Sequence, residues 1–332
     1  RSFARRNRLY RKYDKANGIN FICKLLTLGF IYAITHQKTI IARKIMDLSL
    51  KRVEDFIENN NLQNIKTLYH YCSLASLSGI LENKEIWLSC TASMNDSQEQ
   101  KYFINNLQNN IQANISKDKF QLCNDLFDNI YKRLNKEYPF AFCLSELKDN
   151  AAQWERYADN AYGFSIGFNT YNLVKLLIHS QVLYTKVIYG YNSLNHAHYN
   201  ILREFINSNT ITRGFTNVKG VIDNILICAS SFKHESFCTE QEWRISTILQ
   251  NIPNNGFSSK YEKTNKNIIK KVIVVNLNDL CIKNNIDFED LFDFVIIGPR
   301  SNQSVYELQE YFNHLGYKKL SQKIVKSSCP LK

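Results

Sequence analysis

The stretch "TLYHYCSLASLSGILENKEIWLS", residues 67–89, changes its hydrophobic period twice. Residues 67–73 are rich in Leu and Tyr, which favour a strand. Ser73 is of a type that commonly begins helices. After Ser73, apolar residues recur at the spacing of one helix face, namely Leu74, Leu77, Ile80 and Leu81. Residues 85–89, "EIWLS", are again typical of a strand, so the stretch predicts a compact strand, helix and strand unit.

The mixture of strands and helices continues outward from this unit. We predict further strands at 139–145, 162–168, 181–189, 240–249, 268–275, 292–298 and 318–326. Helical patterns occupy 47–60, 97–115, 117–135, 150–159, 170–179, 193–230, 277–285 and 302–316, and Gly316 is expected to end the last of them. Because the repetition is not strict, the sequence predicts the α+β class. We expect an N-terminal helix at 46–61 and a single mixed domain at 62–332, with a central, largely antiparallel sheet flanked by helices.

The formal net charge of +12 is concentrated near the beginning of the sequence. Residues 1–45 hold eleven Lys and Arg against one acid, Asp14, which gives this segment a net charge of +10. The remaining charge of residues 46–332 is therefore only +2. The body of the protein thus has no electrostatic footprint for DNA or RNA.

Residues 1–45 form a basic and apolar leader that allows three interpretations. A helical pattern starts directly after Met46, which indicates that Met46 is the native start and that the leader is not part of the native protein. The run "INFICKLLTLGFIYAIT" at 19–35 is instead typical of a secretory signal or of an interfacial helix. Lys24 leaves only eleven uncharged residues in this run, too few to cross a bilayer comfortably, so we expect no integral membrane span.

The cysteines and histidines lack the spacing of metal sites. Nine cysteines are scattered irregularly without a C-x-x-C pair, a distribution typical of reduced, buried thiols in the cytoplasm, where we therefore place the protein. His196 and His198 form an H-x-H that no Cys or carboxylate motif accompanies. We expect no metal ion.

The stretch "CTEQEWRIST", residues 238–247, alternates polar and apolar side chains with a period of two. This period predicts a strand with Glu240, Glu242 and Arg244 on one face. Trp243 then lies on the opposite face and is expected to be buried. Two carboxylates and a guanidinium on one face indicate either a ligand site or a structural ion pair.

Four stretches together are similar to a known family. They are "LYHYCSLASLSGILENKEIWLSCTASMNDSQE", "FCLSELKDNAAQWERYADNAYGFSIGF", "TEQEWRI" and "FDFVIIGP". In order and spacing they resemble the bacterial family called domain of unknown function 2971, over about residues 68–315. Ser97 departs from the family pattern, which usually has proline at this place. The resemblance implies a shared fold and no particular reaction.

The order of these motifs is also similar to that of ADP-ribosyltransferases, which split nicotinamide from NAD. This remote similarity implies that His70 orients the NAD ribose and that Ser145 braces the site. It also implies that Glu242 is the catalytic carboxylate, which stabilises an oxocarbenium-like transition state, and that Glu240 contacts the acceptor. The remaining residues that we expect to contact NAD are Tyr69, Tyr71, Trp154, Tyr157 and Arg244. Such an enzyme would suit a bacterial toxin or defence effector.

Each of these residues also has a structural interpretation. His70 is a candidate for a hydrogen-bonded core histidine, and Trp154 and Tyr157 share a helix face and are candidates for packing. Asp96 commonly serves only as a helix cap. Glu240 or Glu242, paired with Arg244 or Arg156, is a candidate for a structural ion pair. Three further residues could bind an anion or simply lie on the surface, namely Lys233, His234 and Arg300.

A second functional class is therefore a non-catalytic module that binds a nucleotide or a partner in a defence or stress system. The body of the chain lacks a long exposed apolar helix, so no protein partner is indicated.

Overall fold

The computed structural model describes residues 51–60, 62–93, 99–134, 136–180, 182–190, 216–249, 252, 256–263 and 268–331. The chain divides into two compact units, Arg1–Asp55 and Phe56–Lys332. Residues 51–59 are helical, within the helix expected at 46–61. The leader at 1–45 lies outside the described residues. The division into leader, N-terminal helix and domain at 62–332 stays a prediction.

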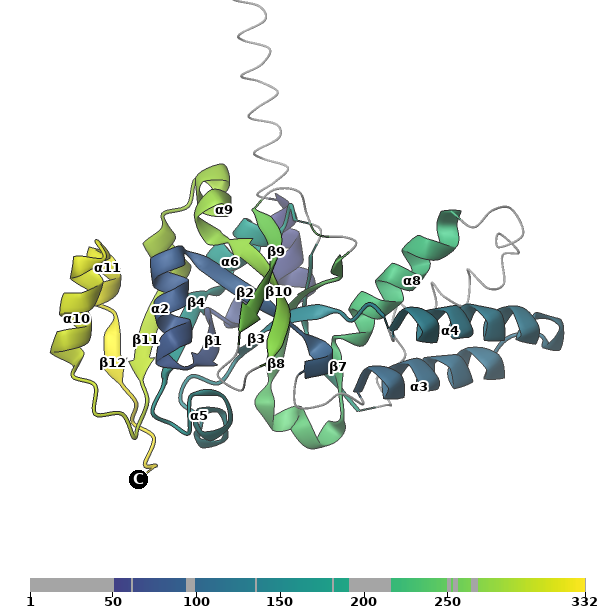
Figure 1. Ribbon diagram of the computed structural model, residues 1–332, viewed down its shortest axis with the longest axis horizontal. Helices are drawn as coiled ribbons and strands as arrows, with labels where there is room; N and C mark the ends of the chain where they lie inside the picture. Colours follow the sequence, from purple (N-terminus) through teal and green to yellow (C-terminus); the bar gives the residue numbers. More distant parts are fainter. Residues whose placement is uncertain are drawn as a thin grey trace, which may run out of the picture. The chain divides into compact units, whose positions relative to one another are not determined.

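A ten-stranded mixed sheet forms the centre of the second unit (Figure 1). Its order is β12-β11-β4-β1-β3-β2-β10-β9, and β8 pairs with both β3 and β5. All its strand pairs are antiparallel except that of β11 with β12. The strands are β1 (Thr67–Cys72), β2 (Glu85–Cys90), β3 (Phe140–Ser145), β4 (Phe164–Asn169), β5 (Leu183–Lys186), β8 (Glu242–Thr247), β9 (Phe257–Lys263), β10 (Ile269–Asn276), β11 (Phe292–Ile297) and β12 (Ile324–Lys326). The prediction of an α+β fold with a largely antiparallel sheet flanked by helices is confirmed.

Helices flank this sheet and extend from it (Figure 1). The α-helices are α2 (Leu74–Asn83), α3 (Glu99–Ala113), α4 (Phe120–Leu134), α5 (Ala151–Tyr157), α6 (Thr170–Leu177), α8 (Thr216–Ala229), α9 (Leu277–Asn284), α10 (Val305–His314) and α11 (Lys318–Ser321). Short 3-10 helices are η1 (Leu62–Asn64), η2 (Thr91–Ser93), η3 (Lys117–Lys119), η5 (Glu235–Glu240) and η7 (Phe288–Leu291). A separate parallel pair consists of β6 (Ile188–Tyr189) and β7 (Phe232–Lys233).

The strand, helix and strand unit at 67–89 is present as β1, α2 and β2. Ser73 caps α2 by accepting a hydrogen bond from the Ser76 amide at 3.3 Å. Three of the four apolar residues of the helix stripe are buried, namely Leu77, Ile80 and Leu81. The two strands are not neighbours, however, because β3 pairs with both of them. β3 thereby joins the local unit to the rest of the sheet.

Helices α3, α4 and α8 lie side by side and share one apolar core (Figure 1). Their buried residues recur every three or four positions, as the helical patterns at 97–115 and 117–135 predict. Members of this core include Phe103, Ile104, Leu107, Phe127, Ile130 and Leu226. Phe232 of β7 stacks on Phe103 with ring centroids 4.0 Å apart. The helical cluster therefore fixes β7, which carries Lys233.

Several boundaries differ from the sequence-based prediction. β9 was not expected, because its exposed residues at an edge of the sheet carry no apolar alternation. The strand expected at 318–326 was wrong in its first part, since α11 precedes the short β12. The strand expected at 240–249 begins only at Glu242, because Gln241 adopts a left-handed conformation with φ of 45°. Of the predicted helical segment 193–230, residues 191–215 lie outside the described part of the chain.

Candidate functional site

Three neighbouring strands bring the predicted site residues together. β3 lies between β1 and β8, and its last residue, Ser145, is opposite Tyr69 on one side and Glu242 on the other. His70 follows Tyr69 on β1, and Arg244 follows two positions after Glu242 on β8. Side chains of a strand alternate between faces, so Glu242 and Arg244 point to the same side while Trp243 points into the core. Trp243 is fully buried, as the alternation predicts.

Glu240 lies at the site, but not on the strand on which the sequence placed it. It ends the 3-10 helix η5, so it is not a strand residue. The left-handed Gln241 turns the chain between the two glutamates. The Ser145 hydroxyl holds this turn by donating to the Glu240 carbonyl at 2.7 Å. Ser145 thus braces the backbone beneath the glutamates, a structural role that any function of the site would share.

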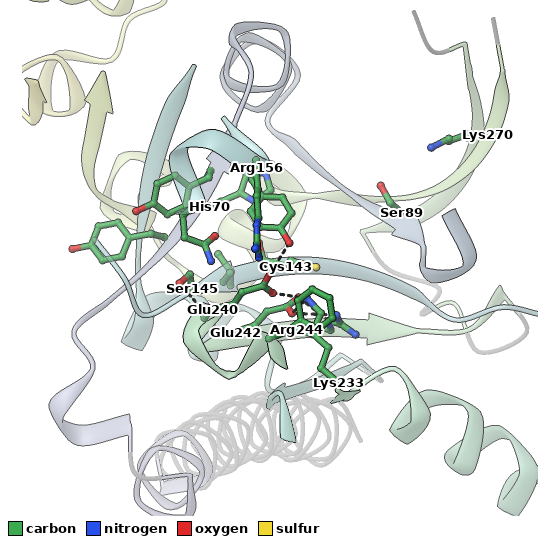
Figure 2. A pocket seen from close by; sticks show the side chains of 16 residues that line it. His70, Ser89, Cys143, Ser145, Arg156, Lys233, Glu240, Glu242, Arg244 and Lys270 are labelled. Carbon is green, nitrogen blue, oxygen red and sulfur yellow. Dashed lines mark hydrogen bonds and ion pairs between the residues drawn. The ribbon is translucent and has the colours of Figure 1, made fainter. Parts of the chain in front are cut away.

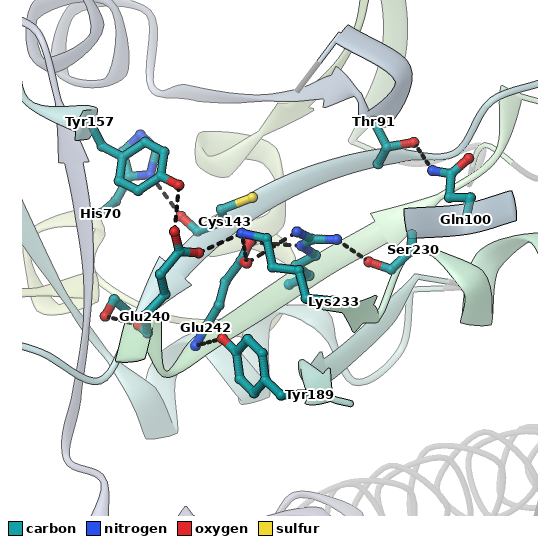
Figure 3. Close-up of polar contacts among 12 residues, drawn as sticks. His70, Thr91, Gln100, Cys143, Tyr157, Tyr189, Ser230, Lys233, Glu240 and Glu242 are labelled. Carbon is teal, nitrogen blue, oxygen red and sulfur yellow. Dashed lines mark hydrogen bonds and ion pairs between the residues drawn. The ribbon is translucent and has the colours of Figure 1, made fainter. Parts of the chain in front are cut away.

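A buried network of charges joins the two glutamates (Figure 3). The Lys233 ammonium lies 2.5 Å from Oε2 of Glu240 and 3.0 Å from Oε2 of Glu242. Arg244 donates to both oxygens of Glu242, from Nε at 2.7 Å and from Nη2 at 3.1 Å. Its Nη1 also donates to the Ser230 carbonyl. These four charged side chains are at most 9% exposed. The predicted ion pairs are thus present, between Glu242 and Arg244 and between Glu240 and Arg156.

Glu240 is as deeply buried as Glu242, but one of its partners is exposed to solvent. Its Oε1 accepts from the Tyr157 hydroxyl at 2.9 Å and from Nη1 of Arg156 at 3.2 Å. The Arg156 side chain is half exposed, whereas the cationic partners of Glu242 are almost completely buried. A ligand entering from solvent would therefore meet Arg156, a partner of Glu240, before it meets Lys233 or Arg244.

The neighbouring charges keep Glu242 and Lys233 in their ionised forms. Burial raises the pKa of Glu242, but Arg244 and Lys233 outweigh this effect and lower it to about 2. Burial lowers the pKa of Lys233, and the Glu242 carboxylate more than compensates, so that the pKa rises. Burial also raises the pKa of the neighbouring Cys143 thiol, with a further contribution from Glu242. Cys143 is therefore a neutral thiol at pH 7 and a poor nucleophile.

His70 lines the cavity and also makes a hydrogen bond to the backbone. Its Nδ1 donates to the Cys143 carbonyl at 2.9 Å, and its ring stacks on Phe142 with centroids 4.2 Å apart. Burial lowers the pKa of His70 to about 4, although the hydrogen bond to Cys143 opposes this shift. The imidazole is thus neutral at pH 7, with Nε2 as a hydrogen-bond acceptor.

These side chains line a cavity of about 340 Å³ (Figure 2). Eight of the nine residues predicted for the site are among them, namely Tyr69, His70, Tyr71, Ser145, Tyr157, Glu240, Glu242 and Arg244. The sequence analysis did not assign several other lining residues to the site, including Ser89, Cys143, Gln153, Lys233, Phe237 and Lys270. In Figure 2, Ser89 of β2 and Lys270 of β10 lie apart from the glutamates.

Trp154 is the predicted site residue that does not line the cavity. It is fully buried, donates from Nε1 to Asp149 at 2.5 Å, and packs edge-on against Tyr71. Packing is therefore the role that the structure supports for Trp154. Tyr157, three residues later, points instead to Glu240.

The other candidate residues lie elsewhere. Arg300 pairs with Glu155 at 3.4 Å and is not among the residues that line the cavity. His234 caps η5 by accepting from the Ser236 amide. Asp96 lies outside the described residues. In the described part of the chain, no group of three or more His, Cys, Asp or Glu side chains could hold a metal ion.

Residues 153–245 match a family model described as Protein of unknown function (DUF2971). The matched segment runs from α5 to β8 and contains both glutamates, Lys233 and Arg156. The match supports the resemblance to this family in that segment, which is a minor part of the chain. No curated protein and no solved structure matches the chain. Within the described residues, no helix is both long and apolar enough to cross a membrane.

Proposed function

We propose that the cavity binds NAD and that the protein is an ADP-ribosyltransferase-like enzyme. The observation that supports this proposal is the position of the residues that the resemblance implies. Those from β1, β3 and β8, together with Tyr157 of α5, line one cavity although they are far apart in the sequence. The proposed reaction breaks the bond between nicotinamide and ribose and transfers ADP-ribose to an acceptor. A toxin or defence effector could use either this transfer or the loss of NAD.

The charges of the cavity suit a ligand that carries phosphates. Its lining includes four cationic side chains, Arg156, Lys233, Arg244 and Lys270, against the two carboxylates of Glu240 and Glu242. The excess of positive charge favours the NAD pyrophosphate. Neutral His70 offers an acceptor at Nε2, which a ribose hydroxyl can satisfy by donating.

The size of the cavity limits how much of the ligand it encloses. A volume of about 340 Å³ is near the lower end of the range of small-molecule sites, roughly 300–1,000 Å³. We therefore place the nicotinamide and its ribose inside, near the glutamates. The pyrophosphate would extend toward Arg156 or Lys270, and the adenosine toward the mouth.

Glu240 is the carboxylate that we assign to catalysis, in place of Glu242. When the glycosidic bond breaks, its electron pair leaves with nicotinamide and positive charge develops on the anomeric carbon and the ring oxygen. A fixed carboxylate beside that carbon stabilises this charge. The acceptor then donates an electron pair to the carbon and loses its proton. Oε1 of Glu240 binds the half-exposed Arg156, which a ligand can displace, whereas both oxygens of Glu242 are bound to the buried Arg244.

A non-catalytic nucleotide-binding module is the second candidate. The observation that favours it is that each oxygen of both carboxylates already accepts from a cationic side chain. A carboxylate whose charge is compensated in this way stabilises a developing cation less strongly. The same cavity would then recognise a nucleotide without changing it.

Release of nicotinamide from NAD separates the two candidates. If the protein is an enzyme, the pure protein should release nicotinamide from NAD. Glu240→Gln should lower the rate of release by roughly 10²- to 10³-fold, as expected when one electrostatic contact to a transition state is removed. Glu155→Gln, on the exposed side of α5, is the matched control and should retain full release. If NAD raises the melting temperature of the wild-type protein without any release, the binding module is correct. If NAD does neither, both candidates fail.

A further inference from the structure

Gln153 is a buried polar residue in the cavity wall that the proposed reaction does not use. It belongs to the first turn of α5 and is 6% exposed. Its backbone amide donates to the cap residue Asn150 at 3.2 Å. Its side-chain amide has no hydrogen-bond partner among the residues that the structure describes, although it lines the cavity.

Gln100, a second buried glutamine among the described residues, offers a comparison. Gln100 is buried to a similar extent, and its amide donates to the Thr91 hydroxyl. Buried amides usually have such partners because an unmet donor or acceptor costs free energy. The Gln153 amide instead presents two donors and an acceptor to the cavity. Because these atoms open onto the cavity, a bound ligand can supply the partner that the described residues do not.

The helix places Gln153 at the glutamate end of the cavity. Arg156 and Tyr157 follow it by three and four positions, so the three side chains lie on one face of α5. Arg156 and Tyr157 both donate to Glu240, and Figure 2 shows Arg156 close to this glutamate and far from Lys270. The Gln153 amide consequently faces the same part of the cavity as Glu240 does.

We propose that Gln153 determines specificity by binding a planar ligand group that carries a hydrogen-bond donor beside an acceptor. A primary amide can pair with such a group through two hydrogen bonds at once, as glutamine does with adenine. This inference rests on the proposed function, because NAD contains two groups of this kind, the nicotinamide carboxamide and the adenine amino edge. Of these two groups, we assign the nicotinamide carboxamide to Gln153. Gln153 lies beside Glu240, and in the proposed reaction Glu240 faces the anomeric carbon to which nicotinamide is attached.

Binding titrations with NAD and two analogues test this assignment. Nicotinic acid adenine dinucleotide replaces the carboxamide with a carboxylate, and nicotinamide hypoxanthine dinucleotide replaces the adenine amino group with a carbonyl. The wild-type protein should bind the acid analogue at least tenfold more weakly than NAD, because a buried amide left without its partner group penalises the wrong ligand. The hypoxanthine analogue should bind as NAD does.

Two substitutions at Gln153 complete the test. Gln153→Met keeps the length of the side chain but removes the amide. This variant should bind NAD more weakly than the wild type does, with about the same affinity as it has for the acid analogue. Gln153→Glu keeps one acceptor, so it should bind NAD more weakly than the wild type and the acid analogue least of all. Gln121→Met, on the exposed side of α4, is the matched control and should bind as the wild type does. Melting temperatures identify any variant that does not fold, and either Gln153 variant alone decides the question.

Each result has one meaning. If the Gln153 variants lose discrimination against the hypoxanthine analogue instead, the inference holds with the adenine edge as its source. If the Gln153 variants bind all three ligands as the wild type does, or lose affinity for all three by the same factor, Gln153 does not determine specificity and the inference is overturned. If the wild type binds no dinucleotide, the NAD proposal fails separately, and titration with AMP and IMP decides the role of Gln153. Equal affinity for these two, or none, then overturns the inference.

Discussion

The Lys233 ammonium lies 2.5 Å from the Glu240 carboxylate, and both side chains are almost fully buried. The same ammonium lies 3.0 Å from Glu242. Lys233 is thus the shared counter-ion of two carboxylates that would otherwise repel each other. The geometry of the site depends on this lysine, whatever ligand the cavity binds.

Lys233→Met should destabilise the protein strongly. Its loss leaves buried carboxylate charge without its partner, which typically costs about 3–5 kcal/mol. Urea unfolding at pH 7 measures this cost, and part of the stability should return on acidification as a glutamate becomes protonated. Lys260→Met, which removes a half-exposed partner of Glu85, should cost less than about 1 kcal/mol. Equal losses in the two variants would show that the network does not depend on Lys233.

Glu242→Gln should destabilise the protein more than Glu240→Gln does. A carboxylate without a structural partner would tolerate this change at little cost. The bidentate contact with buried Arg244 predicts instead a cost of about 3–5 kcal/mol, because the guanidinium loses its counter-ion. Glu240 shares Lys233 and otherwise pairs with the half-exposed Arg156, so its replacement should cost about 1–2 kcal/mol. Urea denaturation of both variants decides the order, and the reverse order would contradict the assignment of Glu242 as structural.

Trp243→Ala should cost about 3–5 kcal/mol, the range for large aromatic residues in a core. Trp243 is fully buried, and its Nε1 donates to Glu146 at 2.8 Å. The matched control is Trp87→Ala, because Trp87 is only partly buried on β2. Its loss should cost clearly less in the same thermal or urea unfolding series. A cost below about 1 kcal/mol for Trp243→Ala would refute the packing of β8 described above.

The protein should lose stability as the pH falls from about 6.5 to about 4. The folded pKa of His70 is lowered to about 4 from its ordinary 6.5, chiefly by burial. Between these values the unfolded chain binds a proton at His70 and the folded protein does not, so acidification favours unfolding. The contribution is on the order of 3 kcal/mol. Unfolding free energies of His70→Asn should show a shallower slope in this window, and exposed His314→Asn should not. An unchanged slope in His70→Asn would assign the titration to other groups.

Local periodicity explains why much of the fold could be predicted. The alternation around Trp243 and the stripe of Leu77, Ile80 and Leu81 depend on neighbours in the sequence, and both are present. The extra strand β9 was missed because its side chains are exposed, so burial imposes no pattern on them. The turn at Gln241 was missed because a left-handed residue other than glycine leaves no mark in a period of two.

The site was predictable only in part, because much of it depends on contacts distant in the sequence. Residues of β1, β3 and β8 could be grouped through the resemblance. Lys233 joins them only because the helical cluster holds β7 beside Glu240, and Lys270 joins them through the pairing of β10 with β2. Gln153 carries no recognisable motif. Its importance rests on its burial and its unmet amide, neither of which a sequence displays.

Calorimetric titration of the pure protein with NAD tests the central claim that the cavity binds this dinucleotide. We predict saturable binding at one site, weakened at least tenfold by Arg156→Gln at the mouth of the cavity. Arg300→Gln, which lies outside the cavity and pairs with Glu155 of the same helix, should leave the affinity unchanged. No heat of binding at millimolar NAD, or equal losses in the two arginine variants, would contradict the account.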